Sequence, residues 1–348
     1  MNEMLHFLVR LLRTPSLSGQ EAAAVQVMVD QMAAFGWEAF VDEAGNAVGH
    51  VGTTGPLVVL LGHIDTVPGD IPVRIEDGKL YGRGAVDAKG PLATFVWAAR
   101  QAELAGVLRC RLAIIGATEE EAASSRGAHA VRDRYRPDFC VIGEPSGWDR
   151  ITLGYKGRLL VHYRYQQPAA HSAGEQRAAP EHLVDFWQAI TRHCQAVNIG
   201  RERLFEQLIP SLRRINSGSD GISEWVEATI GLRLPLGIEP HTLAETLREL
   251  AGPADIVFEG ACPAFQSPRT TPLASAFLRA IRQHGGQPAF VHKTGTADMN
   301  VVGPVWQCPI VAYGPGDSRL DHTPDEHVEV AEYERAIAVL ADVLAQLR

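Results

Sequence analysis

The chain lacks the apolar run of ~18–20 residues that a membrane-spanning helix needs. Its N-terminal apolar stretch is interrupted by Arg10 and Arg13 and has no small-residue cleavage site, so we expect no signal peptide. Basic residues are also scarce, because 32 Lys and Arg stand against 41 Asp and Glu and give a formal net charge of −9. That charge argues against nucleic acid and against an anionic membrane surface as partners.

Cysteines are few, odd in number and far apart, without a CxxC pair: Cys110, Cys140, Cys194, Cys262 and Cys308. Their spacing argues against a disulfide framework and against a zinc site built from thiolates, and it suits a reducing cytoplasm. The composition is otherwise that of an ordinary globular protein, with 46% hydrophobic and 21% charged residues. At 348 residues, the length favours about two domains.

Short stretches in which every residue is apolar predict the strands of an α/β sheet that helices cover on both faces. These stretches are residues 57–61, 112–115, 139–142 and 310–313. Ser18 and Glu21 match the capping box S-x-x-E, so we predict a helix that begins there and ends at Gly36. Asp77 and Gly78 predict a tight hairpin.

The middle of the chain changes rhythm. Its patterns predict strand, helix, strand, strand, helix and strand at residues 157–165, 180–194, 212–215, 224–234, 241–250 and 255–259, which is the order of a small ferredoxin-like sandwich. The first pattern then returns with a helix start at Thr271 and Pro272. We therefore predict an α/β domain with a helix-flanked, mostly parallel sheet at residues 1–155 and 268–348. An inserted ferredoxin-like α+β domain occupies residues 156–267.

Acidic residues and histidines follow directly after the predicted strands. They are His63 and Asp65, then Glu119, Glu120 and Glu121, then Glu144, and later Asp321 and His322, while a glycine-rich loop adds Asp87. In open α/β sheets, ligands bind beyond the carboxyl ends of the strands. We therefore expect these side chains to meet in one crevice.

Imidazoles and carboxylates without thiolates are the donor set of a catalytic zinc site, although cobalt and manganese accept the same donors. A carboxylate shared between two ions would give a two-metal centre, and a remaining glutamate could act as general base towards a water. The His63-x-Asp65 pair suits a metal-bound imidazole whose other nitrogen is held by a carboxylate. Taken singly, an HxD pair is typical of a structural hydrogen bond and adjacent glutamates are typical of a solvated surface. Their joint occurrence after successive strands favours the metal site.

The motifs resemble those of the dinuclear zinc-dependent deacylases and exopeptidases, a family that includes acetylornithine deacetylase, succinyl-diaminopimelate desuccinylase and aminoacylase. The matching segments extend over essentially the whole chain: GHIDTV at 62–67, GRGAVDAKG at 82–90, GATEEE at 116–121, GEPS at 143–146, AHSA at 170–173, GTADMN at 295–300 and DHTPDE at 321–326. In that family the inserted domain serves as a lid and a dimerisation module. The resemblance therefore implies a zinc-dependent amide hydrolase that forms a homodimer.

The same resemblance implies a set of metal ligands. It assigns His63 and Glu144 to one zinc ion, and Glu120 and His322 to the other. Asp87 bridges both ions.

Catalytic roles follow from the resemblance in the same way. Asp65 orients the first zinc-bound histidine, and Glu119 is the general base that takes a proton from the attacking water. His171, in the inserted domain, matches the histidine that reaches the site of the partner subunit and stabilises the oxyanion. A cis peptide bond is implied between Asp87 and Ala88.

Substrate contacts are implied for further residues. Arg233 matches an arginine of the lid that holds a substrate carboxylate, and Gly295 and Thr296 match a substrate-contacting loop. The GTADMN segment and residues 217–235 are most similar to a branch of the family that acts in lysine biosynthesis. Enzymes of that branch release lysine, or ornithine in a related arginine route, from the C-terminal glutamate of a small amino-group carrier protein.

The carrier protein of that branch is acidic, as this chain is, so docking needs a local basic rim. Lys156, Arg158, Arg213 and Arg214 are the candidates, and ordinary solvated charge is the alternative for them. Other substrates stay open, namely small N-acyl amino acids such as acetylornithine, acetyl-lysine or succinyl-diaminopimelate, and dipeptides. The order of the inserted elements argues against an aminopeptidase, and the complete set of ligand positions argues against a metal-free binding protein.

Overall fold

The computed structural model describes residues 2–171 and 173–348. The chain divides into two compact units: unit 1 comprises Met1–Gly154, Ser267–His292 and Ala297–Arg348, and unit 2 comprises Tyr155–Gln266 and Lys293–Thr296. The sequence pattern predicts residues 293–296 in the α/β domain, but they pack with unit 2. They do so because Lys156 N donates to Lys293 O and Thr296 Oγ1 donates to Lys156 O. No helix in the described ranges is long and apolar enough to cross a membrane.

The large sheet of unit 1 has its parallel strands in the middle. Its order is β1-β2-β6-β3-β7-β15-β8, and β14 also pairs with β8. Strands β6, β3, β7 and β15 are mutually parallel, whereas β2 and β8 run antiparallel on either side of them. The bounds are β1 (Glu38–Val41), β2 (Ala47–Val51), β3 (Leu57–His63), β6 (Arg111–Ala117), β7 (Phe139–Gly143), β8 (Arg150–Tyr155), β14 (Ala289–Lys293) and β15 (Ile310–Ala312). The predicted helix-flanked α/β sheet is confirmed, but it is mixed rather than mostly parallel, because β1, β2 and β8 pair antiparallel beside the parallel strands.

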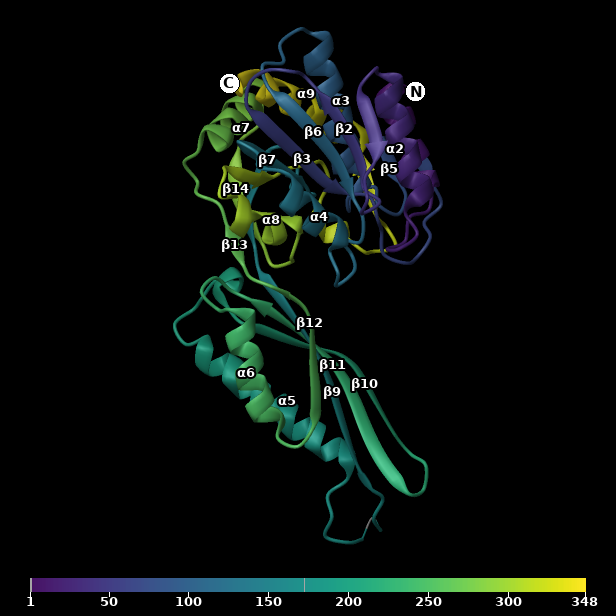
Figure 1. The fold of residues 1–348 in the computed structure, drawn as a ribbon, viewed down its shortest axis with the longest axis vertical. Helices are drawn as coiled ribbons and strands as arrows, with labels where there is room; N and C mark the ends of the chain where they lie inside the picture. Colours follow the sequence, from purple (N-terminus) through teal and green to yellow (C-terminus); the bar gives the residue numbers. More distant parts are fainter. Residues whose placement is uncertain (1, 172) are drawn as a thin grey trace. The chain divides into compact units, whose positions relative to one another are not determined.

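Helices cover both faces of this sheet (Figure 1). Alternate strand residues such as Leu60 and Ile114 share one core with α1, α2, α3, α7 and α9. The intervening residues, such as Leu61 and Ile115, are equally buried, and α4 and α8 contact β6 and β15. The bounds are α1 (Glu3–Arg13), α2 (Ala22–Ala34), α3 (Lys89–Leu104), α4 (Arg126–Arg134), α7 (Pro272–Gln283), α8 (Asp298–Trp306) and α9 (Val330–Gln346).

Two local predictions in unit 1 are confirmed. The Thr271 side chain accepts a hydrogen bond from Ala274 N at 3.0 Å and so caps α7. Asp77 and Gly78, with φ of 49° and 78°, form the hairpin between two short antiparallel strands, to which a third strand is added. These strands are β4 (Arg74–Glu76), β5 (Lys79–Tyr81) and β16 (His327–Glu329), and a 3-10 turn at Ser318–Leu320 precedes β16.

The predicted capping box is wrong. Helix α2 begins at Ala22, and its N-cap residue Glu21 makes no side-chain cap hydrogen bond. The Ser18 hydroxyl and the Glu21 carboxylate instead bind Asp65 and Glu119, which lie in other loops of unit 1. Tertiary partners have therefore replaced the local ones.

Unit 2 has the predicted order of strands and helices. Its antiparallel sheet has the order β10-β11-β9-β12. Helices α5 and α6 pack on one face of it, where Val161, Phe186, Ile230 and Leu247 share a core. The bounds are β9 (Gly157–Pro168), α5 (Ala179–Val197), β10 (Ile209–Ser219), β11 (Ser223–Leu234), α6 (Pro240–Ala251), β12 (Asp255–Cys262) and β13 (Phe265–Gln266), with a 3-10 turn at Leu204–Glu206.

Candidate metal centre

The carboxyl ends of parallel strands bring the predicted ligands of unit 1 to one edge of the sheet. His63 is the last residue of β3, where it lies opposite Ala117 of β6, and Gly62 lies opposite Gly143 of β7. The glutamates at 119–121 and Glu144 follow these neighbouring strands. They therefore leave the sheet beside His63.

Asp87 lies between two histidines. Its Oδ1 is 3.1 Å from His63 Nε2, and its Oδ2 is 3.0 Å from His322 Nε2. Glu144 Oε1 lies 4.0 Å from the same nitrogen of His63, and Glu121 Oε1 lies 2.9 Å from the same nitrogen of His322. A carboxylate with an imidazole and a second carboxylate on each side suits a ligand shared between two cations.

Asp65 holds the imidazole of His63 at Nδ1, the ring nitrogen that does not face Asp87. The Nδ1 atom of His63 is hydrogen-bonded to the backbone oxygen of Asp65 at 3.0 Å and lies 3.4 Å from Asp65 Oδ1. Both side chains are buried, with exposed fractions of 1% and 0%. Because Nδ1 is held in this way, Nε2 faces Asp87 and Glu144, as a metal-bound imidazole requires.

The three consecutive glutamates have three different surroundings. Glu119 points to the start of α4, where its carboxylate accepts a hydrogen bond from Ser124 Oγ at 2.6 Å and lies 3.6 Å from Arg126 Nη1. Glu121 contacts His322, as described above. Glu120 lies in the field of His63, Glu121 and Asp87. The family resemblance implies Glu120 as the ligand that accompanies His322, whereas the structure places Glu121 against this histidine. Three identical neighbours in the sequence offer no signal of which one faces the site.

The electrostatics of this cluster are those of a site with surplus negative charge. Burial, and then neighbouring carboxylates, raise the pKa of Glu120 and of Glu144 well above the ordinary value, although His63 lowers both. Burial acts to lower the pKa of His63, yet hydrogen bonds with Asp65 and Asp87 raise it well above its usual range. Hydrogen bonds with Asp87 and Glu121 raise the pKa of His322 to about 10.

These residues fit a divalent cation. Within the described ranges, donor atoms of His63, Asp87 and Glu121 all lie within 4.8 Å of one another. The set offers nitrogen and oxygen donors of the kind that zinc accepts. Buried carboxylates that repel one another cost free energy unless a cation neutralises them. A bound metal ion would supply that positive charge.

The loop that carries Asp87 is held by a buried residue from the far end of the chain. Glu326 Oε1 accepts hydrogen bonds from Val86 N at 3.0 Å and Asp87 N at 3.1 Å, and its Oε2 lies 2.7 Å from Arg83 Nη1. The peptide bond between Asp87 and Ala88 is cis, as predicted.

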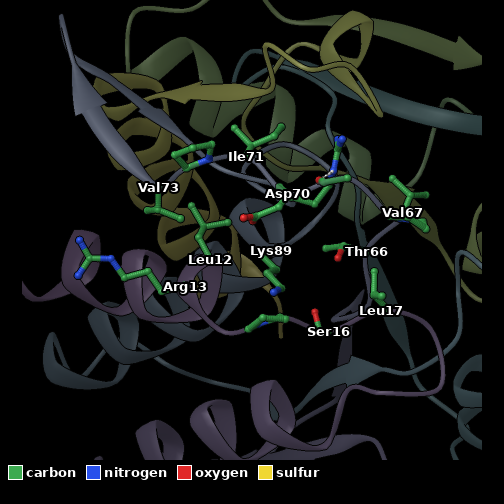
Figure 2. Close-up of a pocket in the computed structure, with 15 residues that line it drawn as sticks. Leu12, Arg13, Ser16, Leu17, Thr66, Val67, Asp70, Ile71, Val73 and Lys89 are labelled. Carbon is green, nitrogen blue, oxygen red and sulfur yellow. Dashed lines mark hydrogen bonds between the residues drawn. The ribbon is translucent and has the colours of Figure 1, made fainter.

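A cavity of about 500 Å³ borders the loop that follows His63, at Thr66 and Val67 (Figure 2). It is lined by Ser16, Leu17 and Thr66 and contains none of the predicted ligands. Lys89 lines it as well, and its Nζ donates to Leu11 O at 3.0 Å and Thr14 O at 2.8 Å. The cavity is therefore bounded by the connection between α1 and α2.

The predicted substrate residues and His171 belong to unit 2. Arg233 Nη1 donates to Thr296 Oγ1 at 2.8 Å, so these two are brought together. Gly295 precedes Thr296, and a Cβ added at Gly295 would point into open space. His171 is exposed, and its Nδ1 accepts the N–H of Ala173 at 3.1 Å. Residue 172 of the AHSA motif lies outside the described residues.

One member of the predicted basic rim is wrong. Lys156 is 0% exposed, and its Nζ donates to the backbone oxygens of Leu204, Phe205 and Gln207. It is therefore a structural cation inside unit 2. Arg213 and Arg214 on β10 are exposed, and Arg158 is half-buried with its Nε on Gly260 O.

The fold and the site together define a metal-dependent hydrolase that acts on amide bonds. A relative from Deinococcus radiodurans, named LysW-lysine hydrolase, is 47% identical over 340 residues, which cover 96% of this chain and 94% of that protein. The sequence model of peptidase family M20/M25/M40 matches residues 59–346. The chain belongs to this family.

Solved structures of the family share the fold. The M20 family metallo-carboxypeptidase Sso-CP2 from Sulfolobus solfataricus has a TM-score of 0.84 at 18% identity, over 100% of this chain and 99% of that one. A dinuclear metal-binding peptidase of the M20 family from Bacillus subtilis has a TM-score of 0.74 at 14% identity, over 98% and 96% of the two chains.

Proposed function

We propose that this chain releases L-lysine from the C-terminal glutamate of an amino-group carrier protein by hydrolysing the amide bond that joins them. The similarity over nearly the full length to a relative named LysW-lysine hydrolase carries this proposal. The Asp87-centred cluster supports the hydrolytic part of it. Ornithine on the same kind of carrier is the second substrate to be tested.

We assign two zinc ions to the cluster, one to His63 and Glu144 and the other to His322 and Glu121, with Asp87 shared. The contacts of Asp87 with both histidines, and of Glu121 with His322, support this division. A bound divalent cation lowers the pKa of water and polarises a carbonyl oxygen.

We assign the general base to Glu120 rather than to Glu119. Glu119 is held by Ser124 and Arg126, whereas Glu120 lies among the charges of the cluster. The Glu120 carboxylate would take a proton from the attacking water and pass it to the nitrogen of the departing amine. Asp65 keeps the Nδ1 atom of His63 engaged throughout.

Unit 2 is assigned the lid and the dimer contact. We propose that Arg233, held by Thr296, pairs with a substrate carboxylate and that Gly295 leaves room for the substrate chain. His171 would donate to the oxyanion across a homodimer, and its exposed position supports a role outside its own subunit's core. These roles follow the family resemblance.

The acidic carrier protein would dock on exposed arginines. Arg213 and Arg214 on β10 offer positive charge on a chain whose net charge is −9, so the contact is local rather than a property of the whole surface. Replacing both with glutamate tests this surface. We expect a higher KM for the carrier conjugate, an unchanged kcat, and no effect on small acylated amino acids.

One assay decides between the substrate classes. Zinc-loaded protein is given the lysine conjugate of the carrier protein, the ornithine conjugate, N-acetyl-lysine, N-acetylornithine and succinyl-diaminopimelate, and the free amino acid is measured. We expect the lysine conjugate to have the highest kcat/KM. A preference for a small acylated amino acid would overturn the carrier assignment, and absence of any amide hydrolysis would overturn the activity.

A further inference from the structure

The connection between α1 and α2, residues 14–21, runs along the loop that follows His63. Ser16 Oγ donates to Ile64 O at 2.7 Å, and Thr66 N donates to Ser16 O at 2.9 Å. Figure 2 shows Ser16 and Leu17 beside Thr66. This pairing fixes the connection against the backbone on either side of Asp65.

Two side chains of the connection continue from there to the glutamate turn at residues 119–121. Ser18 Oγ donates to Asp65 Oδ2 at 2.7 Å. Glu21, which is 6% exposed, uses its Oε1 to accept Gly19 N at 2.8 Å and Glu119 N at 3.1 Å. The two polar side chains of the S-x-x-E pattern, Ser18 and Glu21, therefore bind loops of the metal centre and do not cap helix α2.

The backbone N–H groups of all three residues in the glutamate turn donate hydrogen bonds to buried carboxylates. Glu119 N donates to Glu21, while Glu120 N and Glu121 N donate to the two oxygens of Asp65 at 3.1 and 3.0 Å. Asp65 is 0% exposed. Consecutive N–H groups that converge on anions fix the backbone of a turn strongly, because charge-assisted hydrogen bonds are short and strong.

The backbone at Glu119 needs such support. Its φ of 58° lies in the left-handed region that a glutamate seldom adopts. This conformation sends the Glu119 side chain towards Ser124 and lets the next two residues turn towards His63 and His322. A change of φ here would redirect both of them.

We propose that Glu21 is a positioning residue that holds the Glu119 N–H and thereby aims Glu120 and Glu121 into the metal centre. The inference rests on the proposed function in one respect, because it takes Glu120 as the base and Glu121 as a ligand. Ser18 supports the same turn by a separate route, because its hydroxyl donates to Asp65, which accepts the N–H groups of Glu120 and Glu121.

The test compares Glu21→Ala with Glu21→Gln, which keeps an amide oxygen in the same place, and with Glu43→Ala, which removes an exposed glutamate elsewhere in unit 1. In Glu21→Ala we expect faster hydrogen exchange of the peptide that spans residues 116–124, and zinc affinity weakened about 10–100-fold in calorimetry. We expect kcat to fall with KM little changed. Glu21→Gln restores most of each loss, and Glu43→Ala shows none.

Equal losses in Glu21→Ala and Glu21→Gln would overturn the proposal, as would unchanged exchange and zinc affinity in Glu21→Ala. Glu21→Asp provides a second measurement if Glu21→Ala does not fold, because its shorter side chain draws the carboxylate back from Glu119 N. We expect smaller losses in the same direction, and unchanged exchange and affinity in Glu21→Asp would equally count against the role. Exchange and zinc affinity need no substrate. If the chain failed to hydrolyse any amide, these two readouts would still decide the role of Glu21 separately.

Discussion

The hydrogen bonds between Glu326 and the loop that carries Asp87 allow a quantitative prediction. Glu326 is 0% exposed and accepts the N–H groups of Val86 and Asp87 on one oxygen, while its other oxygen pairs with Arg83, whose side chain is 13% exposed. Glu326→Ala leaves two buried donors without this acceptor and removes the carboxylate that faces the guanidinium. At about 1–3 kcal/mol for each of the two unsatisfied donors, we expect unit 1 to lose about 2–6 kcal/mol of its free energy of unfolding, and loss of the charged hydrogen bond to Arg83 adds to this.

Glu326→Gln separates the two contributions. The side-chain oxygen of glutamine still accepts both amides, so only the charged hydrogen bond to Arg83 is lost, at about 1.5–3 kcal/mol. Arg83 also keeps its bonds to Gly69 O and Thr323 O, which limits this cost. Urea unfolding of the metal-free protein measures the free energies. Glu329→Ala is the matched control, because Glu329 is exposed and pairs with Lys79 at the surface, a contact worth about 0–1 kcal/mol.

A cost of Glu326→Ala within about 1 kcal/mol of that of the Glu329→Ala control, which is the size of an ordinary surface effect, would contradict this prediction. Equal costs for alanine and glutamine at position 326 would contradict it as well. In that case the amides of the Asp87 loop would not depend on the carboxylate oxygen.

The remaining predictions concern the base, the metal and unit 2. Glu120→Gln is expected to lower kcat about 10²–10⁴-fold, while elemental analysis finds its zinc content unchanged. Glu119→Gln is expected to keep most of the activity. The reverse ranking of the two variants would assign the general base to Glu119. Zinc binding to chelator-treated protein at pH 7 is expected to release protons, because hydrogen bonds with Asp87 and Glu121 raise the pKa of His322 to about 10 and keep it protonated without metal. Calorimetry in two buffers of different ionisation enthalpy measures this release, and a heat independent of the buffer would contradict it. Lys156→Met is expected to destabilise unit 2 by about 1–3 kcal/mol in urea unfolding, because the carbonyls of Leu204, Phe205 and Gln207 lose the donor that the buried lysine supplies. A loss below that of an exposed lysine variant would argue against the structural role.

Local sequence signals predicted those parts of the fold whose partners are close in the chain. The hairpin at Asp77 and Gly78 and the cap at Thr271 are set by backbone conformation and by hydrogen bonds over a few residues. The apolar stretches at 57–61 and 112–115 became central strands because a strand buried on both faces needs apolar residues at every position.

The predictions that failed concern side chains whose partners are distant in sequence. Ser18 and Glu21 have the right spacing for a capping box, but Asp65 and Glu119 lie within reach in the fold and compete successfully for them. Lys156 has the charge expected of a docking residue, yet carbonyls of residues 204–207 surround its ammonium group. Spacing along the chain carries no information about such partners.

The sequence by itself determined the class of the site. Imidazoles and carboxylates placed after strands of a parallel block must meet at one edge of the sheet, because the carboxyl ends of parallel strands share that edge. Only the tertiary structure decided which of the three glutamates contacts His322. That choice depends on the left-handed turn at Glu119 and on the carboxylates of Glu21 and Asp65, which hold the turn from segments about 50–100 residues away in the chain.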